Sequence, residues 1–210
     1  MGSLRSILWT VVSIGILAFS AGTGAAEPPL EAIRSTVERA RAVLEDPAYQ
    51  GPDQREQRIA KVREILLPQF DSQEIAKRTL GTHWRKRTEE ERKQFVQLFV
   101  DLVEKTYSSN LDRYDPGVKL FFDQERIIDG EYAEVDTRIF DPVLDKTFAI
   151  NYRMHKSDGR WLIYDVIAEN ISMVGNYRNQ FHRILSKSSY QDLVQKIEQK
   201  LKELSSASPS

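Results

Sequence analysis

Cysteine is absent from this chain of 210 residues, which excludes disulfides, a cysteine nucleophile and a lipid-attachment thiol. Stability must therefore come from a hydrophobic core, and a hydrophobic content of 40% is sufficient for one. A charge excess of either sign is also absent, because 30 basic residues face 31 acidic ones. The chain therefore lacks the basic footprint of a nucleic-acid-binding protein.

Histidine is scarce, and the common enzyme motifs are missing. His83, His155 and His182 fall in different predicted elements, and none has a second histidine at the spacing of a zinc site. The chain has no GxSxG, HExxH, P-loop or dinucleotide fingerprint. The sequence therefore predicts no metal site, no catalytic residue and no bound cofactor.

A single long apolar run is present, from Ile7 to Phe19. It follows Arg5 and precedes small residues that end before Glu27, which is the pattern of a cleaved secretory signal peptide. The run is shorter than the roughly 20 residues that span a bilayer, which disfavours the alternative of an uncleaved anchor. The expected parts of the chain are a signal peptide at 1–26, one domain at 27–204 and a disordered tail at 205–210.

Four segments in the first half of the chain repeat apolar residues at helical spacing. They cover 30–44, 59–66, 72–80 and 88–107. Asp71 can cap the third of these helices, and Gly81 is a typical C-terminal stop. Thr88 and Glu91 form a capping box at the start of the fourth and longest helix.

Beyond Pro116 the apolar period changes from helical to two, which predicts four strands. They are Val118–Ile127, Tyr132–Phe140, Thr147–Lys156 and Trp161–Ala168. Asp129-Gly130 and Asp158-Gly159 are strong hairpin signals, so the strands should form an antiparallel meander. Closing helices are expected at 174–186 and 189–204. This order of elements predicts an α+β domain whose sheet packs on a helical layer.

The segment Trp161–Phe181 holds a carboxylate in an apolar setting. Both faces of its strand are largely apolar, so the strand should be covered on both sides and Asp165 should have a partner. Asp165 and Glu169 could share a face and do acid–base work. Alternatively they hold Arg178 or cap the helix that starts near Ser172, and structural pairing of this kind is the commoner cause of such patterns.

Two separated composite motifs, in Leu80–Leu111 and Asp158–Phe181, carry a family resemblance. The matching residues are Leu80, Gly81, Trp84, Arg85, Thr88, Phe95, Phe99, Thr106, Tyr107, Gly159, Trp161, Tyr164, Asp165, Val166, Glu169, Ile171, Ser172, Asn176, Tyr177, Arg178 and Phe181. This pattern closely resembles the MlaC family, also described as toluene-tolerance or auxiliary transport proteins. Asn170 and Glu91 stand where the family usually has glycine and glutamine. Asparagine tolerates a left-handed backbone and glutamate completes a capping box, so neither change opposes the resemblance.

The resemblance implies a soluble periplasmic phospholipid carrier. It would shuttle lipid between an outer-membrane lipoprotein–porin complex and an inner-membrane ABC transporter with a substrate-binding ring. It would not be an enzyme, and we expect a monomer. The implied fold is a twisted antiparallel sheet of four or slightly more strands, wrapped by N-terminal and C-terminal helices into a cone like that of nuclear transport factors. Acyl chains would enter its hydrophobic cavity, and the head group would stay at the mouth.

The carrier hypothesis assigns a lining for the acyl chains. Their roughly 30 methylenes would each cost about 0.8 kcal/mol in water, so apolar side chains must cover them. We expect the stripe of the longest helix to face the sheet, with the turn after the last strand as the rim. The expected lining is Phe95, Leu98, Phe99, Leu102, Val103, Phe148, Ile150, Tyr152, Trp161, Ile163, Ile171, Met173 and Val174. Asp165, Glu169 and Arg178 are expected to form a structural latch.

Three alternatives stay open from the sequence. The first is a carrier of another hydrophobic lipid, such as a hopanoid or a sterol-like molecule. The second is a periplasmic hydrolase or isomerase in a cone-shaped fold, in which Asp165 and Glu169 would be the acid–base pair. The third is an adaptor that recognises the transporter without holding lipid, and a filled interior would favour it.

Overall fold

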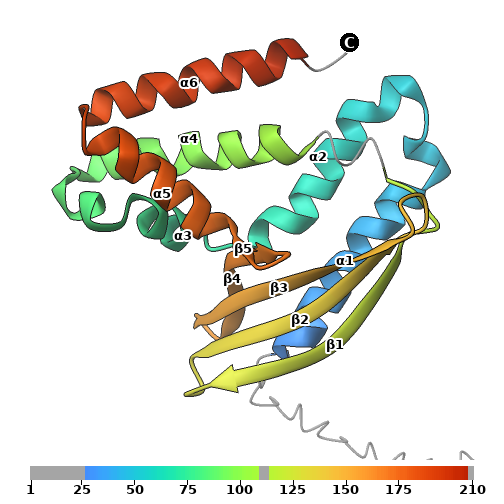
Figure 1. Cartoon of the computed structure of the whole chain (residues 1–210). Helices are drawn as coiled ribbons and strands as arrows, with labels where there is room; N and C mark the ends of the chain where they lie inside the picture. Colours follow the sequence, from blue (N-terminus) through green and yellow to red (C-terminus); the bar gives the residue numbers. More distant parts are fainter. Residues whose placement is uncertain (1–26, 109–113, 208–210) are drawn as a thin grey trace, which may run out of the picture.

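Five antiparallel strands and six α-helices form the part of the chain described by the computed structural model, residues 27–108 and 114–207 (Figure 1). The α-helices are α1 (Pro29–Glu45), α2 (Arg55–Leu66), α3 (Ser72–Leu80), α4 (Glu89–Ser108), α5 (Met173–Leu185) and α6 (Tyr190–Ala207). Short 3-10 helices are η1 (Pro47–Tyr49), η2 (Pro52–Gln54), η3 (Leu67–Gln69) and η4 (Gly81–Lys86). The strands are β1 (Lys119–Ile128), β2 (Tyr132–Asp141), β3 (Lys146–Ser157), β4 (Arg160–Ala168) and β5 (Ile171–Ser172).

The predicted α+β class and the antiparallel sheet are confirmed. The strand order is β1-β2-β3-β4-β5, so each strand pairs with its neighbour in sequence, and β5 adds a short edge strand. The hairpin signals hold in detail: φ is 52° at Asp129 and 73° at Gly130, and 48° at Asp158 and 76° at Gly159. Positive φ at both central residues of a turn matches the twist of the strands. The β3–β4 connection is a two-residue hairpin, and the β1–β2 connection has three residues between the paired Ile128 and Tyr132.

Helix ends follow the predicted capping chemistry. The carboxylate of Asp71 accepts from the backbone N–H of Glu74 at 2.8 Å. Thr88 and Glu91 form the capping box, with backbone-to-side-chain bonds of 2.9 and 3.2 Å. Gly81 ends α3 with φ of 56°, and the chain continues as η4, which the sequence pattern did not predict.

The predicted boundary between the domain and the tail, at 204/205, falls within the described residues. Residues 205–207 are helical, because α6 continues to Ala207, although the sequence predicted a disordered tail from 205. The predicted signal peptide at 1–26 and residues 208–210 lie outside the described residues. Among the helices of the described ranges, none is long and apolar enough to cross a membrane.

Two hydrophobic clusters make the core. The helical cluster is formed mainly by α3, α4, α5 and α6; its buried members are Ile75, Ala76, Leu80, Trp84, Phe95, Phe99, Leu102, Val174, Tyr177, Phe181, Tyr190, Leu193, Val194 and Ile197. The sheet cluster joins α1 to the sheet; its buried members are Ile33, Ala133, Val135, Met154, Trp161 and Ile163. Phe70 is half-buried and packs against both clusters, so it marks where they meet.

The apolar stripe of α4 lies in the helical cluster, so the expectation that it faces the sheet is wrong. Phe99 meets the ring of Tyr177 edge-on at 5.0 Å between centroids. Phe95 meets Phe181 in the same way at 5.8 Å. α6 runs alongside α4 at the top of Figure 1, and α1 lies behind the sheet instead. Helical spacing identifies the apolar face of α4, but it does not identify which of several apolar elements covers that face.

Phe99→Ala should lower the free energy of unfolding by about 3–5 kcal/mol, because it removes a buried ring from the middle of the helical cluster. Urea unfolding followed by circular dichroism measures the change. Gln94→Ala on the exposed face of the same helix is the matched control and should stay within about 0.5 kcal/mol of the unmodified protein. Equal losses in both variants would contradict the assigned packing of α4.

Candidate functional site

The sheet presents one apolar face toward α1, which we call the inner face. The strand register places Ala133 opposite Met154, and Met154 opposite Ile163, so these side chains project to the same side. Alternation along the strands adds further members. The apolar inner face comprises Ala133, Val135, Ile139, Phe148, Ile150, Tyr152, Met154, Trp161, Ile163 and Val166.

The inner face becomes more exposed along β3. Met154 is 0% exposed, whereas Ile150 and Phe148 are half-buried. In the β2–β3 turn beyond them, Val143 is 75% exposed and Leu144 is 63% exposed. A contiguous apolar surface that is only partly covered is a typical contact surface for an apolar ligand or partner.

The position of α1 explains this gradient. Its main contacts with the sheet are to β1 and β2. In Figure 1 this helix lies behind the sheet. The backbone N–H of Leu30 donates to the carboxylate of Glu125 at 2.7 Å, and the guanidinium of Arg34 lies 4.3 Å from the centre of the Phe122 ring. Because α1 is tied to the β1 side, the first residues of β3 receive less cover.

Tyr152 places a polar group within the inner face. Burial raises the pKa of its phenol, and the neighbouring Thr137 hydroxyl opposes part of that rise. The phenol therefore stays neutral well above pH 7, and no charge is buried. Thr137 is itself buried and donates to the carbonyl of Ile150 at 3.1 Å. The centre of the inner face thus has its polar atoms satisfied by neutral groups, whereas Glu125 on β1 and Lys146 at the start of β3 are exposed charged members of the same face.

The expected lining residues are brought together only in part. The sheet members Phe148, Ile150, Tyr152, Trp161 and Ile163 share the inner face. The members from α4 lie in or against the helical cluster; they are Phe95, Leu98, Phe99, Leu102 and Val103.

The expected rim residues are divided in the same way. Val174 is buried in the helical cluster, and Met173 is half-buried and packs on it. Ile171 is 64% exposed at the start of β5. The proposed rim therefore contributes one exposed apolar side chain beside the sheet and two side chains that stabilise the helices.

Asp165 is a buried carboxylate that fixes the turn from strand to helix. One carboxylate oxygen accepts from the Ser172 hydroxyl at 2.6 Å, and the other accepts from the backbone N–H of Val174 at 3.0 Å. Ser172 in turn accepts from the N–H of Gly175 at 2.8 Å and caps α5. Arg153 lies 3.7 Å from the Asp165 carboxylate. The carboxylate is therefore held by a helix N-terminus and one guanidinium.

Arg178 does not join this latch. Within the described ranges its side chain has neither an ion pair nor a hydrogen bond, and the aliphatic part of that side chain lies near Gly81. Its expected partnership with Asp165 is therefore wrong, because α5 turns that residue toward α3 and η4. Arg153 from the neighbouring strand takes the position instead.

Glu169 is exposed and has a separate structural contact. Its carboxylate accepts from the backbone N–H of Ala149 at 2.8 Å, and its own N–H donates to the Ala149 carbonyl at 3.0 Å. The backbone is left-handed at both turn residues, with φ of 49° at Glu169 and 65° at Asn170. Asparagine thus adopts the conformation for which glycine would be the usual choice. Asp165 and Glu169 do not bond to each other, so the arrangement shows no shared-proton carboxylate pair.

Several exposed or half-buried apolar residues were missed by sequence reasoning. They are Ile139, Val143, Leu144 and Val166. The signal was present in the β2–β3 turn, because Asp-Pro-Val-Leu-Asp carries two apolar residues where turns are usually polar. Across residues 27–108 and 114–207, no group of three or more possible metal ligands is assembled.

Comparisons with known proteins agree with this fold. The sequence profile of the MlaC protein family matches residues 34–199. The intermembrane phospholipid transport system binding protein MlaC of Haemophilus influenzae is 23% identical over 143 residues, which is 66% of this chain and 65% of that protein's length. A phospholipid-binding protein from Ralstonia solanacearum, solved in complex with a phospholipid, superposes with a TM-score of 0.75 at 21% identity. That match covers 85% of this chain and 99% of the other.

Asp165→Ala should destabilise the protein by about 1–3 kcal/mol, because it leaves the buried N–H of Val174 and the Ser172 hydroxyl without their acceptor. Glu169→Gln is the matched control, since an amide oxygen can still accept from Ala149. Thermal and urea unfolding compare the two. Equal stability of Asp165→Ala and the unmodified protein would contradict the structural role.

Proposed function

The chain belongs to the MlaC family, and on that premise we propose that it is a carrier of phospholipid that holds acyl chains against the inner face of its sheet. The observation that carries the proposal is the half-covered apolar surface from Met154 through Ile150 to Phe148. The names of the two similar proteins support the choice of a phospholipid, since both are described as binding or transporting one.

The chemistry of the inner face suits such a cargo. Removing apolar surface from water stabilises the complex by about 25 cal/mol for each Å². Both the acyl chains and the half-buried side chains of the inner face contribute to that area. At the centre of the inner face the polar groups of Tyr152 and Thr137 are neutral. The charged members Glu125 and Lys146 lie on the edge strand β1 and at the start of β3, where both are exposed, so the tails need not desolvate them. Binding of the tails over β3 would also leave the helical cluster packed, so Phe95 and Phe99 need not separate for loading.

The cellular role follows as part of the same proposal. We place the mature protein in the periplasm, where it moves lipid between an outer-membrane lipoprotein–porin complex and an inner-membrane ABC transporter with its substrate-binding ring. A bound diacyl lipid would have to leave by contact with a membrane complex, because release into water would expose both tails. The exposed turn residues Val143 and Leu144 lie where such contact could begin.

Catalysis by Asp165 and Glu169 is disfavoured by their geometry. Both oxygens of the Asp165 carboxylate accept hydrogen bonds that hold α5, and Glu169 is exposed and bonded to the edge of β3. A general acid and a general base must both lie within hydrogen-bond reach of the same substrate. The carrier therefore accounts for these residues better than a hydrolase or isomerase does.

Ile150→Asp should abolish co-purification of diacyl phospholipid, because a carboxylate would sit where the tails are expected to lie. Native mass spectrometry of the purified protein measures the bound mass, and lipid extraction identifies it. Thr147→Asp is the matched control, since this residue of the same strand lies on the opposite, exposed face and should keep its lipid.

The outcomes separate the alternatives. A bound hopanoid or sterol-like mass would correct the cargo, whereas a protein that carries no lipid and extracts none from liposomes would contradict the carrier. Equal lipid loading in Ile150→Asp and the unmodified protein would contradict the placement of the lipid site on the inner face.

A further inference from the structure

A second candidate site lies on the helical layer and shares no residue with the inner face. A cavity of about 500 Å³ opens where η4 and the start of α4 meet the turn between α5 and α6. The lining residues that matter for its chemistry are His83, Lys86, Arg87, Glu91 and Tyr190. Its size is that of a small-ligand site, and its lining combines apolar atoms with the two cations Lys86 and Arg87.

Arg87 is the main cation of this cavity. Its guanidinium lies 4.6 Å from the centre of the Tyr190 ring, within the range of a cation–π contact that helps to fix its position. One terminal nitrogen donates to Glu91 at 3.3 Å, whereas the Nε–H is buried and has no partner among the described residues. Because protein atoms enclose this N–H, a ligand in the cavity would contact the guanidinium through its terminal nitrogens.

Lys86 adds a second cation and is not neutralised by the protein. It is exposed, and no ion pair involves it within the described ranges. The only carboxylate of the lining is Glu91, which already accepts from the backbone N–H of Thr88 and from Arg87. Asp192 caps the N-terminus of α6 through both the N–H and the hydroxyl of Ser189. The cavity therefore has an excess of donors that its own acceptors do not use.

One imidazole, His83 of η4, lines the cavity, and a second, His182 of α5, lies beside it. His83 Nε2 lies 3.3 Å from His182 Nδ1. Burial, His182, Lys86 and Arg87 together lower the pKa of His83, so this imidazole is neutral at pH 7. A bound anion would offset the last three of these influences and raise the pKa of His83.

We propose that this cavity binds a phosphate group, either as free phosphate or a small phosphate ester, or as the head group of a phospholipid. The tetrahedral oxyanion supplies acceptors to the guanidinium of Arg87 and the ammonium of Lys86, which are the side chains best suited to phosphate. Only the phosphate group binds here, and the acyl tails are not part of this site. Binding here goes beyond lipid carriage on the inner face, and each can fail without the other.

A titration of the full chain with its native lipid content tests the site. Inorganic phosphate and glycerol 3-phosphate are added at constant ionic strength, and ¹H–¹⁵N spectra report on the backbone amides of Lys86, Arg87 and Tyr190. A separate arm adds phosphatidylglycerol vesicles to identify a lipid source. We expect saturable shifts in this cluster and an upward shift of the His83 pKa in the bound form.

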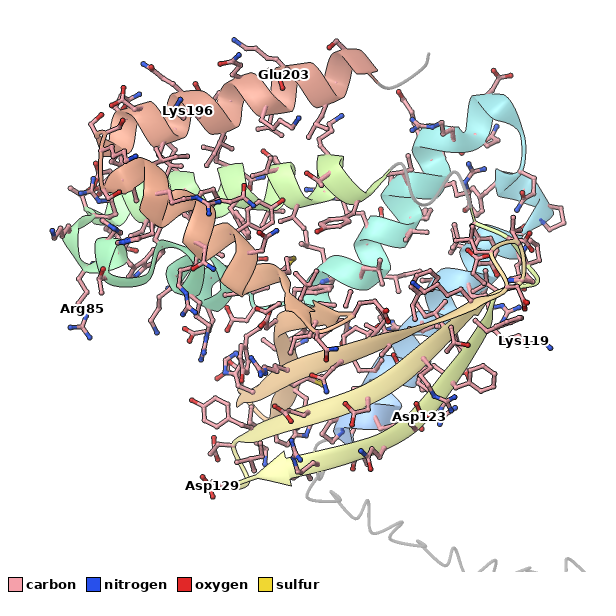
Figure 2. All side chains as sticks on the ribbon, viewed as in Figure 1. Arg85, Lys119, Asp123, Asp129, Lys196 and Glu203 are labelled. Carbon is pink, nitrogen blue, oxygen red and sulfur yellow. The ribbon has the colours of Figure 1, made fainter. Side chains whose placement is uncertain are left out.

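Lys86→Gln should weaken the affinity about tenfold, as expected for loss of a charged hydrogen bond. Arg85→Gln is the matched control: it removes the same charge one residue away, and Figure 2 shows Arg85 pointing from the helical layer into solvent. Arg85→Gln should bind as the unmodified protein does, and both variants should keep their co-purified phospholipid. Equal weakening by the two variants would show diffuse electrostatics and overturn the site. An absence of saturable shifts in every arm would overturn it as well.

Discussion

The hydrogen bonds of the Asp165 carboxylate hold the two halves of this fold together. Ile163, two residues earlier in β4, is buried in the sheet cluster, whereas Val174, whose N–H the carboxylate binds, is buried in the helical cluster. Tyr164 packs on the helical side of the same strand. A carboxylate buried at this junction would be costly without its acceptor bonds, and with them it fixes the direction in which the chain leaves the sheet. The placement of α5, and of the α6 that follows it, depends on that direction.

The division into two clusters has a consequence for the inner face. The apolar stripe of α4 packs against α5 and α6, and α1 is tied to the β1 side of the sheet. The start of β3 therefore receives less cover from both α4 and α1. Apolar surface is thereby left partly exposed without a cost to the rest of the core. A carrier needs a partly exposed apolar surface beside an intact core, because the protein must stay folded after its cargo has left.

The two candidate sites differ in the same physical terms. The centre of the inner face has neutral, satisfied polar atoms and apolar side chains of increasing exposure, which favours hydrocarbon. The cavity beside η4 is lined by the guanidinium of Arg87, by the ammonium of Lys86, which has no ion pair within the described residues, and by one carboxylate, Glu91, which favours an oxyanion. The residues of the second site come from two separate stretches of the chain, 83–91 and 185–191, and neither sequence pattern suggests a ligand.

The amino-acid sequence alone determined the local structure of this protein. Asp129-Gly130 and Asp158-Gly159 specify hairpins, Thr88 with Glu91 specifies a helix start, and period-two apolar patterns specify strands, because each depends on neighbouring residues only. The family motifs likewise predicted the α+β fold. Only the tertiary structure decided which apolar faces meet and which cation pairs with Asp165. The faces depend on the tertiary structure because the apolar stripe of one element can pack against that of any other. The cation depends on it because Arg153 and Arg178 carry the same charge, and only the placement of the strands and helices brings Arg153 close to Asp165.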